Sequence, residues 1–315
     1  MKPTLIVTGS SGFVGSELIP LLQDYFTIVG IDRRAGASTA IVADISGIAS
    51  VEYMIPAEGF YVLHLAAARF DYGASAIDYY NSNVSETERF LEWLGSKRVF
   101  GFVHVSSVAA FDGEDIEFRE GLGCDDAYRS TKFLQGERIK SWARECGVPL
   151  HLLYPSAIFN DHYRSDTNIG KLQFLVNFLP ILVKIPSRKS LTYLPEFSKF
   201  VMKCLLSEVQ TGEYLTIERP VLSVAEILAG LSRRTAIQIT VPFLYPMLIV
   251  LSYVLWGLVG GRVDMKITPN RVNKLFSNTD YETVPSGIDC GVYNSGHGNT
   301  HEILKFVAEA KLRND

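Results

Sequence analysis

Thr8-Gly9-Ser10-Ser11-Gly12-Phe13-Val14-Gly15 is a glycine-rich turn between the apolar run Leu5 to Val7 and an amphipathic stretch. In a strand-to-helix turn, the first glycine lets the chain turn sharply, the second lets backbone amides approach a pyrophosphate, and the third lets the helix lie close to the strand. The helix N-terminus adds aligned N–H groups and partial positive charge. We therefore expect a dinucleotide-binding turn whose contacts come from Gly9, Ser11, Gly12, Phe13, Val14 and Gly15.

The pattern around this turn predicts a parallel sheet wrapped by helices, because short apolar or β-branched runs alternate with longer amphipathic stretches. The expected strands are residues 5–8, 27–31, 40–43, 61–65, 99–105 and 150–154, and the expected helices are residues 12–24, 75–95 and 126–146. Residues 1–155 thus read as a doubly wound, Rossmann-type α/β domain. Residues 156–315 are expected to form a smaller substrate-binding α/β subdomain, some of whose segments could return to the first domain. Its expected strands are residues 191–194 and 214–217, and its expected helices are residues 196–206 and 224–232.

The composition indicates a folded cytoplasmic protein. Of 315 residues, 47% are hydrophobic and 20% are charged, and the net charge of −4 supplies no cationic field for nucleic acid. The cysteines are spaced neither as a metal site nor as a disulfide framework, which favours a reducing compartment and no metal. The N-terminus has no signal-peptide pattern.

One segment, residues 235–261, carries no charged residue and includes the dense apolar run from Met247 to Val259. Because Pro242 and Pro246 precede that run, the uninterrupted helical part has about 13 residues, against ~20 for a membrane span. Three interpretations stay open: a buried or dimer-interface helix, a membrane-surface contact through residues 241–259, and a spanning helix.

Acidic residues at the ends of the second and third strands suggest which dinucleotide binds. Asp32 can accept hydrogen bonds from the adenosine ribose hydroxyls and would repel a 2′-phosphate, which favours NAD. Arg33 and Arg34 follow directly and could pair with a 2′-phosphate, so NADP remains an alternative. Asp44 and its neighbour Ile45 are candidates for the adenine contact, although Asp44 could simply cap a turn.

Tyr128 and Lys132 lie four residues apart on one helix face, and a positive charge near a phenol favours its phenolate. Such a pair can serve as an acid/base, and oxidised nicotinamide adds a second positive charge. Ser107 ends the fifth strand at the carboxyl edge of the sheet, where its hydroxyl could hold a reacting carbinol oxygen.

Together these motifs resemble the extended short-chain dehydrogenase/reductase superfamily, which includes the NAD-dependent epimerase/dehydratase family. The resemblance implies that Ser107 orients the substrate, that Tyr128 is the acid/base, and that Lys132 favours the phenolate and holds the ribose. It also implies cofactor contacts from the loop after the fourth strand, from a helix segment with Glu86 in place of the usual glycine, and from the end of the sixth strand. These contacts are Leu65, Ala66, Ala67, Asn83, Tyr154 and Pro155. His64 gains no catalytic role from the resemblance.

Departures from the pattern narrow the expected chemistry. Val108 and Ala109 follow Ser107 where related 4,6-dehydratases carry an Asp-Glu pair, so dehydration is disfavoured. Val108 also replaces a cysteine of the related 3,5-epimerising reductases. Asn160 is a candidate substrate contact, with a turn former as its alternative, and Arg188 is a candidate for a substrate diphosphate.

The leading hypothesis is an NAD(P)-dependent oxidoreductase or epimerase that acts on a carbinol of a nucleotide sugar. One alternative is a 3β-hydroxysteroid-type dehydrogenase on an apolar alcohol, supported by the apolar segment and compatible with membrane association. A non-catalytic cofactor sensor is the third, disfavoured because Ser107, Tyr128 and Lys132 are all present. The family habit implies a homodimer through residues 75–95 and 126–146.

Overall fold

Apolar runs of the sequence pair side by side in a sheet of eight strands. The computed structural model describes residues 2–68, 74–160, 169–170, 172–173, 176, 181–232, 237–241, 243–259, 269–281, 289–294, 300 and 303–304. The strands are β1 (Thr4–Thr8), β2 (Thr27–Asp32), β3 (Ile41–Val42), β4 (Phe60–His64), β5 (Val99–Val105), β6 (Leu150–Pro155), β11 (Gly212–Thr216) and β14 (Gly291–Tyr293). Their order is β14-β11-β6-β5-β4-β1-β2-β3, and β1 to β6 pair in parallel.

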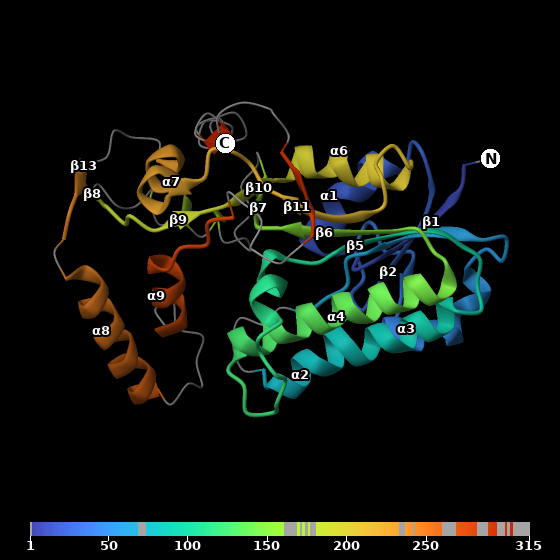
Figure 1. The fold of residues 1–315 in the computed structure, drawn as a ribbon, viewed down its shortest axis with the longest axis horizontal. Helices are drawn as coiled ribbons and strands as arrows, with labels where there is room; N and C mark the ends of the chain where they lie inside the picture. Colours follow the sequence, from blue (N-terminus) through green and yellow to red (C-terminus); the bar gives the residue numbers. More distant parts are fainter. Residues whose placement is uncertain are drawn as a thin grey trace. The chain divides into compact units, whose positions relative to one another are not determined.

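Helices cover both faces of this sheet (Figure 1). α1 (Phe13–Leu22) and α6 (Leu194–Leu205) lie on one face, and α3 (Glu86–Leu94) and α4 (Cys124–Cys146) lie on the other. The predicted doubly wound α/β sheet is therefore confirmed. Because β2 and β4 lie on opposite sides of β1, the strand order reverses there, and ligands of such sheets bind beyond the carboxyl ends of the strands at that point.

The core between the sheet and α3 is apolar. Ile6, Val62 and Phe102, on three neighbouring strands, are completely buried, and Phe90 and Leu94 of α3 pack in the same cluster. Each such side chain contributes roughly 1.5–3 kcal/mol through removal from water. This packing holds the carboxyl ends of the central strands in fixed register.

The predicted helix over residues 75–95 is three segments in the structure. α2 (Ala76–Tyr80) starts at a capping box formed by Ser75 and Asp78, and a π-helical turn, η2 (Asn81–Ser85), joins it to α3. A π-turn admits one extra residue per turn, which apolar periodicity does not reveal. α4 begins two residues before its predicted start and ends at Gly147 with φ of 65°, a left-handed conformation that suits glycine. Two 3₁₀ segments, η1 (Ile45–Met54) and η3 (Val108–Gly113), follow β3 and β5.

The chain divides into two compact units. Unit 1 comprises Met1–Pro155, Glu196–Leu215 and Asp289–Gly291, and unit 2 comprises Ser156–Pro195, Thr216–Ile288 and Val292–Asp315. Short strands pair in unit 2 as β7 (Ala157–Phe159) with β10 (Leu191–Tyr193), β8 (Ile181–Val183) with β13 (Ile237–Ile239), and β9 (Arg188–Lys189) with β12 (Leu222–Ser223). Its helices include α7 (Val224–Leu231), α8 (Leu244–Val259) and α9 (Pro269–Phe276).

α8 corrects two expectations about the apolar segment. The helix begins at Leu244 and keeps Pro246 in its first turn, where a missing N–H breaks no helical hydrogen bond. Its large side chains are mostly exposed, Val250 at 62% and Leu258 at 78%, so the interpretation as a buried core helix is wrong. Among the described residues, no helix has both the length and the apolarity needed to cross a bilayer.

Candidate active site

The glycine-rich turn forms a tight backbone cradle between β1 and α1. Gly9 has φ of +71°, and its amide donates to the Ile31 carbonyl at 2.9 Å. A Cβ on Gly9 would lie 2.9 Å from the Ala66 nitrogen, and one on Gly15 would lie 2.5 Å from the Gly9 carbonyl oxygen. Both positions therefore need glycine for steric reasons, as the sequence predicted.

The cradle fits a dinucleotide phosphate. The Ser11 hydroxyl oxygen is buried with no hydrogen-bond partner among the described residues, and Gly12 is the N-cap of α1, where no side chain caps the helix. Phe13 and Val14 form the first turn of α1. A buried hydroxyl beside a helix N-terminus suits an anionic oxygen, since both supply donors to it.

Asp32 lies at the predicted ribose position beside the cradle. Its carboxylate accepts from the Ser11 amide at 3.0 Å and from the Arg34 amide at 3.0 Å. These bonds fix the acid at the end of β2 against the glycine turn. A carboxylate held there accepts from ribose hydroxyls and opposes a 2′-phosphate.

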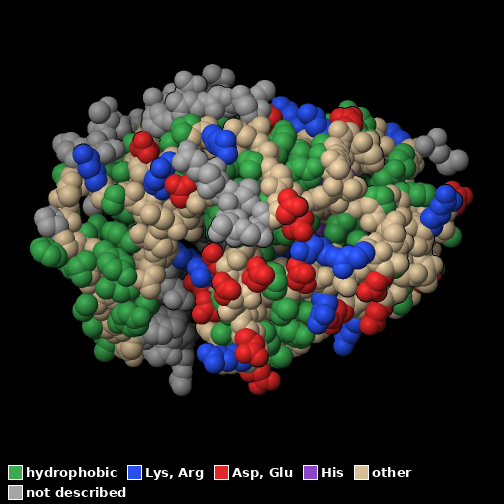
Figure 2. All heavy atoms as spheres, in the orientation of Figure 1, with side chains coloured by type: hydrophobic (Ala, Val, Ile, Leu, Met, Phe, Trp, Pro, Cys, Tyr) green, Lys and Arg blue, Asp and Glu red, His purple; other side chains and the backbone are tan. Residues whose placement is uncertain are grey.

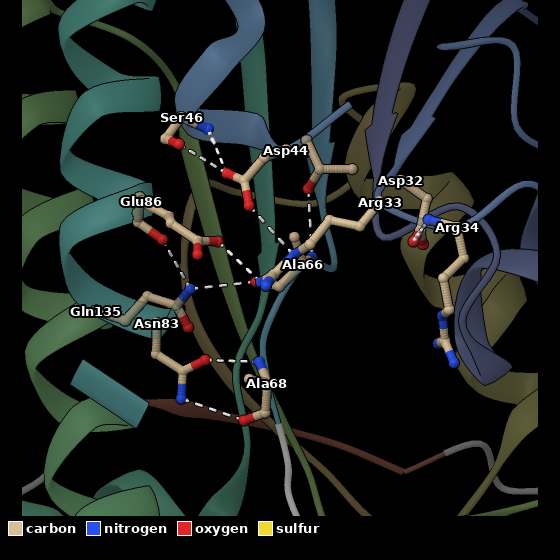
Figure 3. A network of polar contacts seen from close by, with 12 residues as sticks. Asp32, Arg33, Arg34, Asp44, Ser46, Ala66, Ala68, Asn83, Glu86 and Gln135 are labelled. Carbon is tan, nitrogen blue, oxygen red and sulfur yellow. Dashed lines mark hydrogen bonds and ion pairs between the residues drawn. The ribbon is translucent and has the colours of Figure 1, made fainter. Parts of the chain in front are cut away.

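Arg33, the residue that left NADP open, is held by two carboxylates (Figure 3). Its guanidinium lies 3.3 Å from Asp44 and 2.9 Å from Glu86. The Asp44 carboxylate also accepts from the Ser46 amide at 2.9 Å, so it caps the 3₁₀ segment that starts at the buried Ile45. Because two acids compensate its charge, Arg33 is poorly suited to recruiting a phosphate.

Glu86, at the position where the resembled family has glycine, is the third member of that cluster. Burial raises the pKa of Glu86 to about 7, with the Arg33 charge opposing this rise and the Asp44 charge contributing to it. The cluster therefore changes charge near neutral pH.

Asn83 connects the helical segment to the loop after β4 (Figure 3). Its side-chain oxygen accepts from the Ala68 amide at 2.7 Å, and its nitrogen donates to the Thr131 hydroxyl at 3.1 Å. The π-turn carries this buried side chain between the loop and α4. The loop itself, residues 65–67, is tied to β1 through hydrogen bonds from the Leu65 and Ala66 amides to Thr8.

Behind the loop, Lys132 ends a buried polar network that the sequence did not reveal. The Lys132 amine donates to the Gln135 side-chain oxygen at 2.6 Å, and the Gln135 nitrogen donates to the Thr87 hydroxyl at 3.0 Å and the Ala66 carbonyl at 3.3 Å. The His64 ring is 2.8 Å from the Thr8 hydroxyl. A glutamine three residues after the lysine on one helix was the available signal.

Burial sets the protonation states in this network. It lowers the pKa of Lys132 to about 7, and it lowers the pKa of His64 to about 3 with a smaller contribution from Lys132. His64 is therefore neutral, and its ring hydrogen-bonds within this network. Lys132 can change its charge near neutral pH.

Ser107 and Tyr128 lie on two elements that pack together. Ser107 follows β5 as the N-cap of η3, and its hydroxyl accepts from the Ala109 amide at 3.2 Å. Gly113 at the end of η3 is so close to α4 that a Cβ on it would lie 2.2 Å from the Arg129 carbonyl oxygen. The Tyr128 ring is 6.2 Å from that of Tyr79. Unit 1 thus contains the cradle, the ribose acid and all three expected catalytic residues.

Four further predicted contacts lie at the end of β6 and in unit 2. The Tyr154 hydroxyl donates to Glu213 on β11, and burial, followed by that interaction, raises the pKa of Tyr154. Its phenol therefore links two strands of the sheet. Pro155 is the last residue of β6. Asn160 is buried in unit 2. Arg188, also in unit 2, lies 3.2 Å from Asp280 and donates to the Val221 carbonyl at 3.2 Å. Among the described residues, no group of His, Cys, Asp or Glu is arranged to hold a metal ion.

Comparison with known proteins bears on this arrangement. The chain is similar to an N-acetyl-α-D-glucosaminyl-diphospho-ditrans,octacis-undecaprenol 4-epimerase of Escherichia coli O157:H7, with 23% identity over 239 residues that cover 73% of this chain and 71% of the relative. A crystal structure of UDP-galactose 4-epimerase superposes with a TM-score of 0.63 at 18% identity, covering 99% of both chains. UDP-glucuronic acid 4-epimerase from Bacillus cereus, solved with NAD, gives a TM-score of 0.59 at 19% identity, covering 76% of this chain and 87% of that one.

The family assignment rests on the sequence itself. Residues 5–175, more than half of the chain and including the cradle, Asp32, Ser107, Tyr128 and Lys132, match the family described as NAD dependent epimerase/dehydratase. The description names the cofactor expected from Asp32, and the predicted resemblance is confirmed. The chain belongs to the NAD-dependent epimerase/dehydratase family.

Proposed function

We propose that the protein is an NAD-dependent 4-epimerase of a sugar carried on a diphosphate, whether the carrier is a nucleoside or a polyprenol. The observation that supports the proposal is that unit 1 contains the phosphate cradle, Asp32 bonded to it, and the residues Ser107, Tyr128 and Lys132. Relatives named as 4-epimerases act on both kinds of carrier, UDP in two solved structures and undecaprenyl diphosphate in the E. coli protein.

The cofactor would lie with its pyrophosphate at Gly9 to Gly15, its adenosine ribose at Asp32, and its adenine near Asp44 and Ile45. Loop residues Leu65 to Ala67, Asn83 and the end of β6 would line the path toward Tyr128. Held by these residues, NAD would supply the hydride acceptor and donor that oxidation and re-reduction of the sugar carbon require.

Tyr128 removes the proton of the sugar hydroxyl as its carbon is oxidised and returns a proton when it is reduced. Ser107 donates to the same oxygen and keeps it at hydrogen-bond distance from Tyr128. When protonated, Lys132 favours the phenolate of Tyr128. Because its pKa is about 7, Lys132 can lose its proton near neutral pH at a small free-energy cost. Val108 and Ala109 after Ser107 provide no carboxyl group for water elimination, which favours epimerisation over dehydration.

A single substitution tests the assignment of Tyr128. In Tyr128→Phe we expect the thermal shift produced by NAD to remain, while conversion between C4 epimers, followed by NMR with UDP-sugars and polyprenyl diphosphate sugars, falls by roughly 100-fold or more. Tyr25→Phe, at an exposed tyrosine of unit 1, is the matched control and should convert substrate normally. Unchanged conversion by Tyr128→Phe would show that another group moves the proton.

A second candidate is oxidation of an apolar alcohol of the 3β-hydroxysteroid type, which the exposed apolar helix α8 favours. The two reactions differ in cofactor balance, because an epimerase regenerates NAD within each turnover and a dehydrogenase accumulates NADH. Accumulation of NADH absorbance with a sterol, and none with a diphosphate sugar, would select the second candidate.

A further inference from the structure

Helix α8 presents a continuous apolar face to the solvent. Met247, Val250, Leu251, Val254 and Leu258 recur at the spacing of one helix side and are between 43% and 78% exposed. Figure 2 shows the apolar side chains gathered over this part of unit 2, and no residue of α8 is charged. Exposed apolar surface of this extent on a soluble chain indicates a binding surface.

The opposite side of α8 is fixed to unit 2. Ser252 is fully buried, and its hydroxyl donates to the Ile249 carbonyl at 2.7 Å. The Tyr245 hydroxyl donates to the Asn273 side-chain oxygen on α9 at 2.9 Å, and its ring lies 5.2 Å from that of Phe276. The outer face is therefore presented by a helix that is packed in place.

Length and polarity limit what can cover this face. The 16 residues of α8 extend ~24 Å, short of the ~30 Å hydrocarbon core of a bilayer. Tyr245 and Tyr253 are exposed at 42% and 60%, and tyrosine prefers the boundary between headgroups and acyl chains. These properties suit a helix that lies in the membrane surface.

The charges that border α8 are positive. Lys274 on α9 is exposed, as is Lys184, whose amide donates to the Ile239 carbonyl at 2.8 Å shortly before α8 begins. Described residues 237–241, 243–259 and 269–281 include a single acid, Asp280, whose carboxylate lies 3.2 Å from the guanidinium of Arg188. The sequence on either side adds Arg233, Arg234, Arg262 and Lys266 against Asp264. Anionic headgroups complement these charges, whereas a symmetric pairing of α8 with a second copy would bring like charges together.

We propose that α8 docks unit 2 on an anionic phospholipid bilayer, so that the sugar substrate reaches the enzyme on a membrane-embedded polyprenyl diphosphate. The choice of carrier rests on the proposed epimerase function, but the docking surface does not. Of the two diphosphate carriers, only the polyprenol resides in a membrane, and the exposed apolar face gives the enzyme access to that phase.

Vesicle flotation tests the docking surface. The full-length protein is expected to float with phosphatidylcholine vesicles that contain phosphatidylglycerol, and less with pure phosphatidylcholine or at high salt. Val250→Asp combined with Val254→Asp should reduce the floated fraction by roughly tenfold or more, because carboxylates resist transfer into the acyl boundary. Tyr53→Asp, at a tyrosine of unit 1 that is 84% exposed, is the matched control and should float like the wild type.

Thermal melting of each variant shows that it is folded, and flotation of the wild type decides the question without any variant. Failure of the wild type to float, or equal flotation of the double variant, would overturn the proposal. Light scattering gives a further outcome that would overturn the proposal. If the wild type is a dimer that does not bind vesicles, and the double variant is a monomer, the apolar face binds a second copy.

The same experiments distinguish a failure of the epimerase proposal from a failure of the docking surface. Conversion of a soluble UDP-sugar without vesicle binding leaves the function standing and refutes the docking surface. Vesicle binding without conversion of any diphosphate sugar refutes the function and the carrier while the docking surface stands. Faster conversion of a vesicle-embedded polyprenyl diphosphate sugar by the wild type than by the double variant, with equal rates on soluble UDP-sugars, would support all three.

Discussion

Replacing the buried Lys132 with methionine should make the protein more stable while removing the amine that the proposed mechanism assigns to the activation of Tyr128. Lys132 is 1% exposed, and burial lowers its pKa from 10.5 to about 7. The unfolded chain therefore binds one more proton than the native state between pH 7 and pH 10.5, so that native stability rises with pH across that window. Methionine has a similar shape and no proton to lose.

The expected gain can be worked out at pH 8. There the lowered pKa costs the native state roughly 3 kcal/mol, and losing the hydrogen bond to Gln135 takes back roughly 1 kcal/mol. Lys132→Met should therefore raise the free energy of unfolding by about 2 kcal/mol at pH 8, and the gain should vanish toward pH 10.5. Conversion of substrate should be lost at the same time.

Urea unfolding at several pH values between 7 and 10, followed by circular dichroism, measures this difference. Lys140→Met on the same helix is the matched control of opposite sign. Burial opposes the charge of Lys140, but Glu137 and Glu213 hold its pKa above the ordinary value, so its removal should lower stability. A Lys132→Met protein less stable than the wild type at pH 8, or a gain that does not shrink as the pH rises, would refute the reasoning.

Further outcomes follow from the cradle and the cluster beside it. Gly15→Ala places a methyl group 2.5 Å from the Gly9 carbonyl oxygen and should lower the melting temperature by roughly 5 °C or more and abolish the thermal shift with NAD, whereas Gly47→Ala, which meets open space, should do neither. Burial raises the pKa of Glu86 to about 7, so the native state binds more protons than the unfolded chain between pH 4.5 and 7. The free energy of unfolding should therefore fall as the pH rises through that window. Urea titrations of Glu86→Gln should not show this fall. In calorimetric titrations, Asp32→Ala should weaken NAD binding and narrow the preference over NADP, and an unchanged preference would contradict the ribose contact.

The sequence predicted the parts of the site that depend on local backbone demands. Gly9 and Gly15 leave room for no other residue, and the end of a strand places Asp32 beside them, so their pattern is readable within one strand-turn-helix segment. The sheet was predictable for a similar reason, since parallel strands buried on both faces are short apolar runs.

What the sequence did not reveal depends on segments that meet only in the folded chain. Arg33, Asp44 and Glu86 come from three separate segments, and the sequence suggested cofactor contacts for Arg33 and Asp44 but no interaction among the three. The spacing of Lys132 and Gln135 allows their hydrogen bond, but the sequence does not show that the pair is buried. Burial is what lowers the pKa of Lys132. The exposure of α8 is also a tertiary property, because a uniformly apolar helix looks the same in sequence whether protein or water surrounds it.

The non-consecutive strand order of the sheet has a consequence for how the protein is made. β6, completed at Pro155, pairs on one side with β11, which ends at Thr216, and β14 follows β11 in the sheet. At ~5–20 residues per second, a ribosome needs several seconds to supply the roughly sixty residues between β6 and the end of β11. During that interval the nascent domain exposes an apolar strand edge that a second nascent chain could join. Slow translation between Pro155 and Thr216 should therefore lower the soluble yield, and a recombinant fragment ending at residue 155 should aggregate.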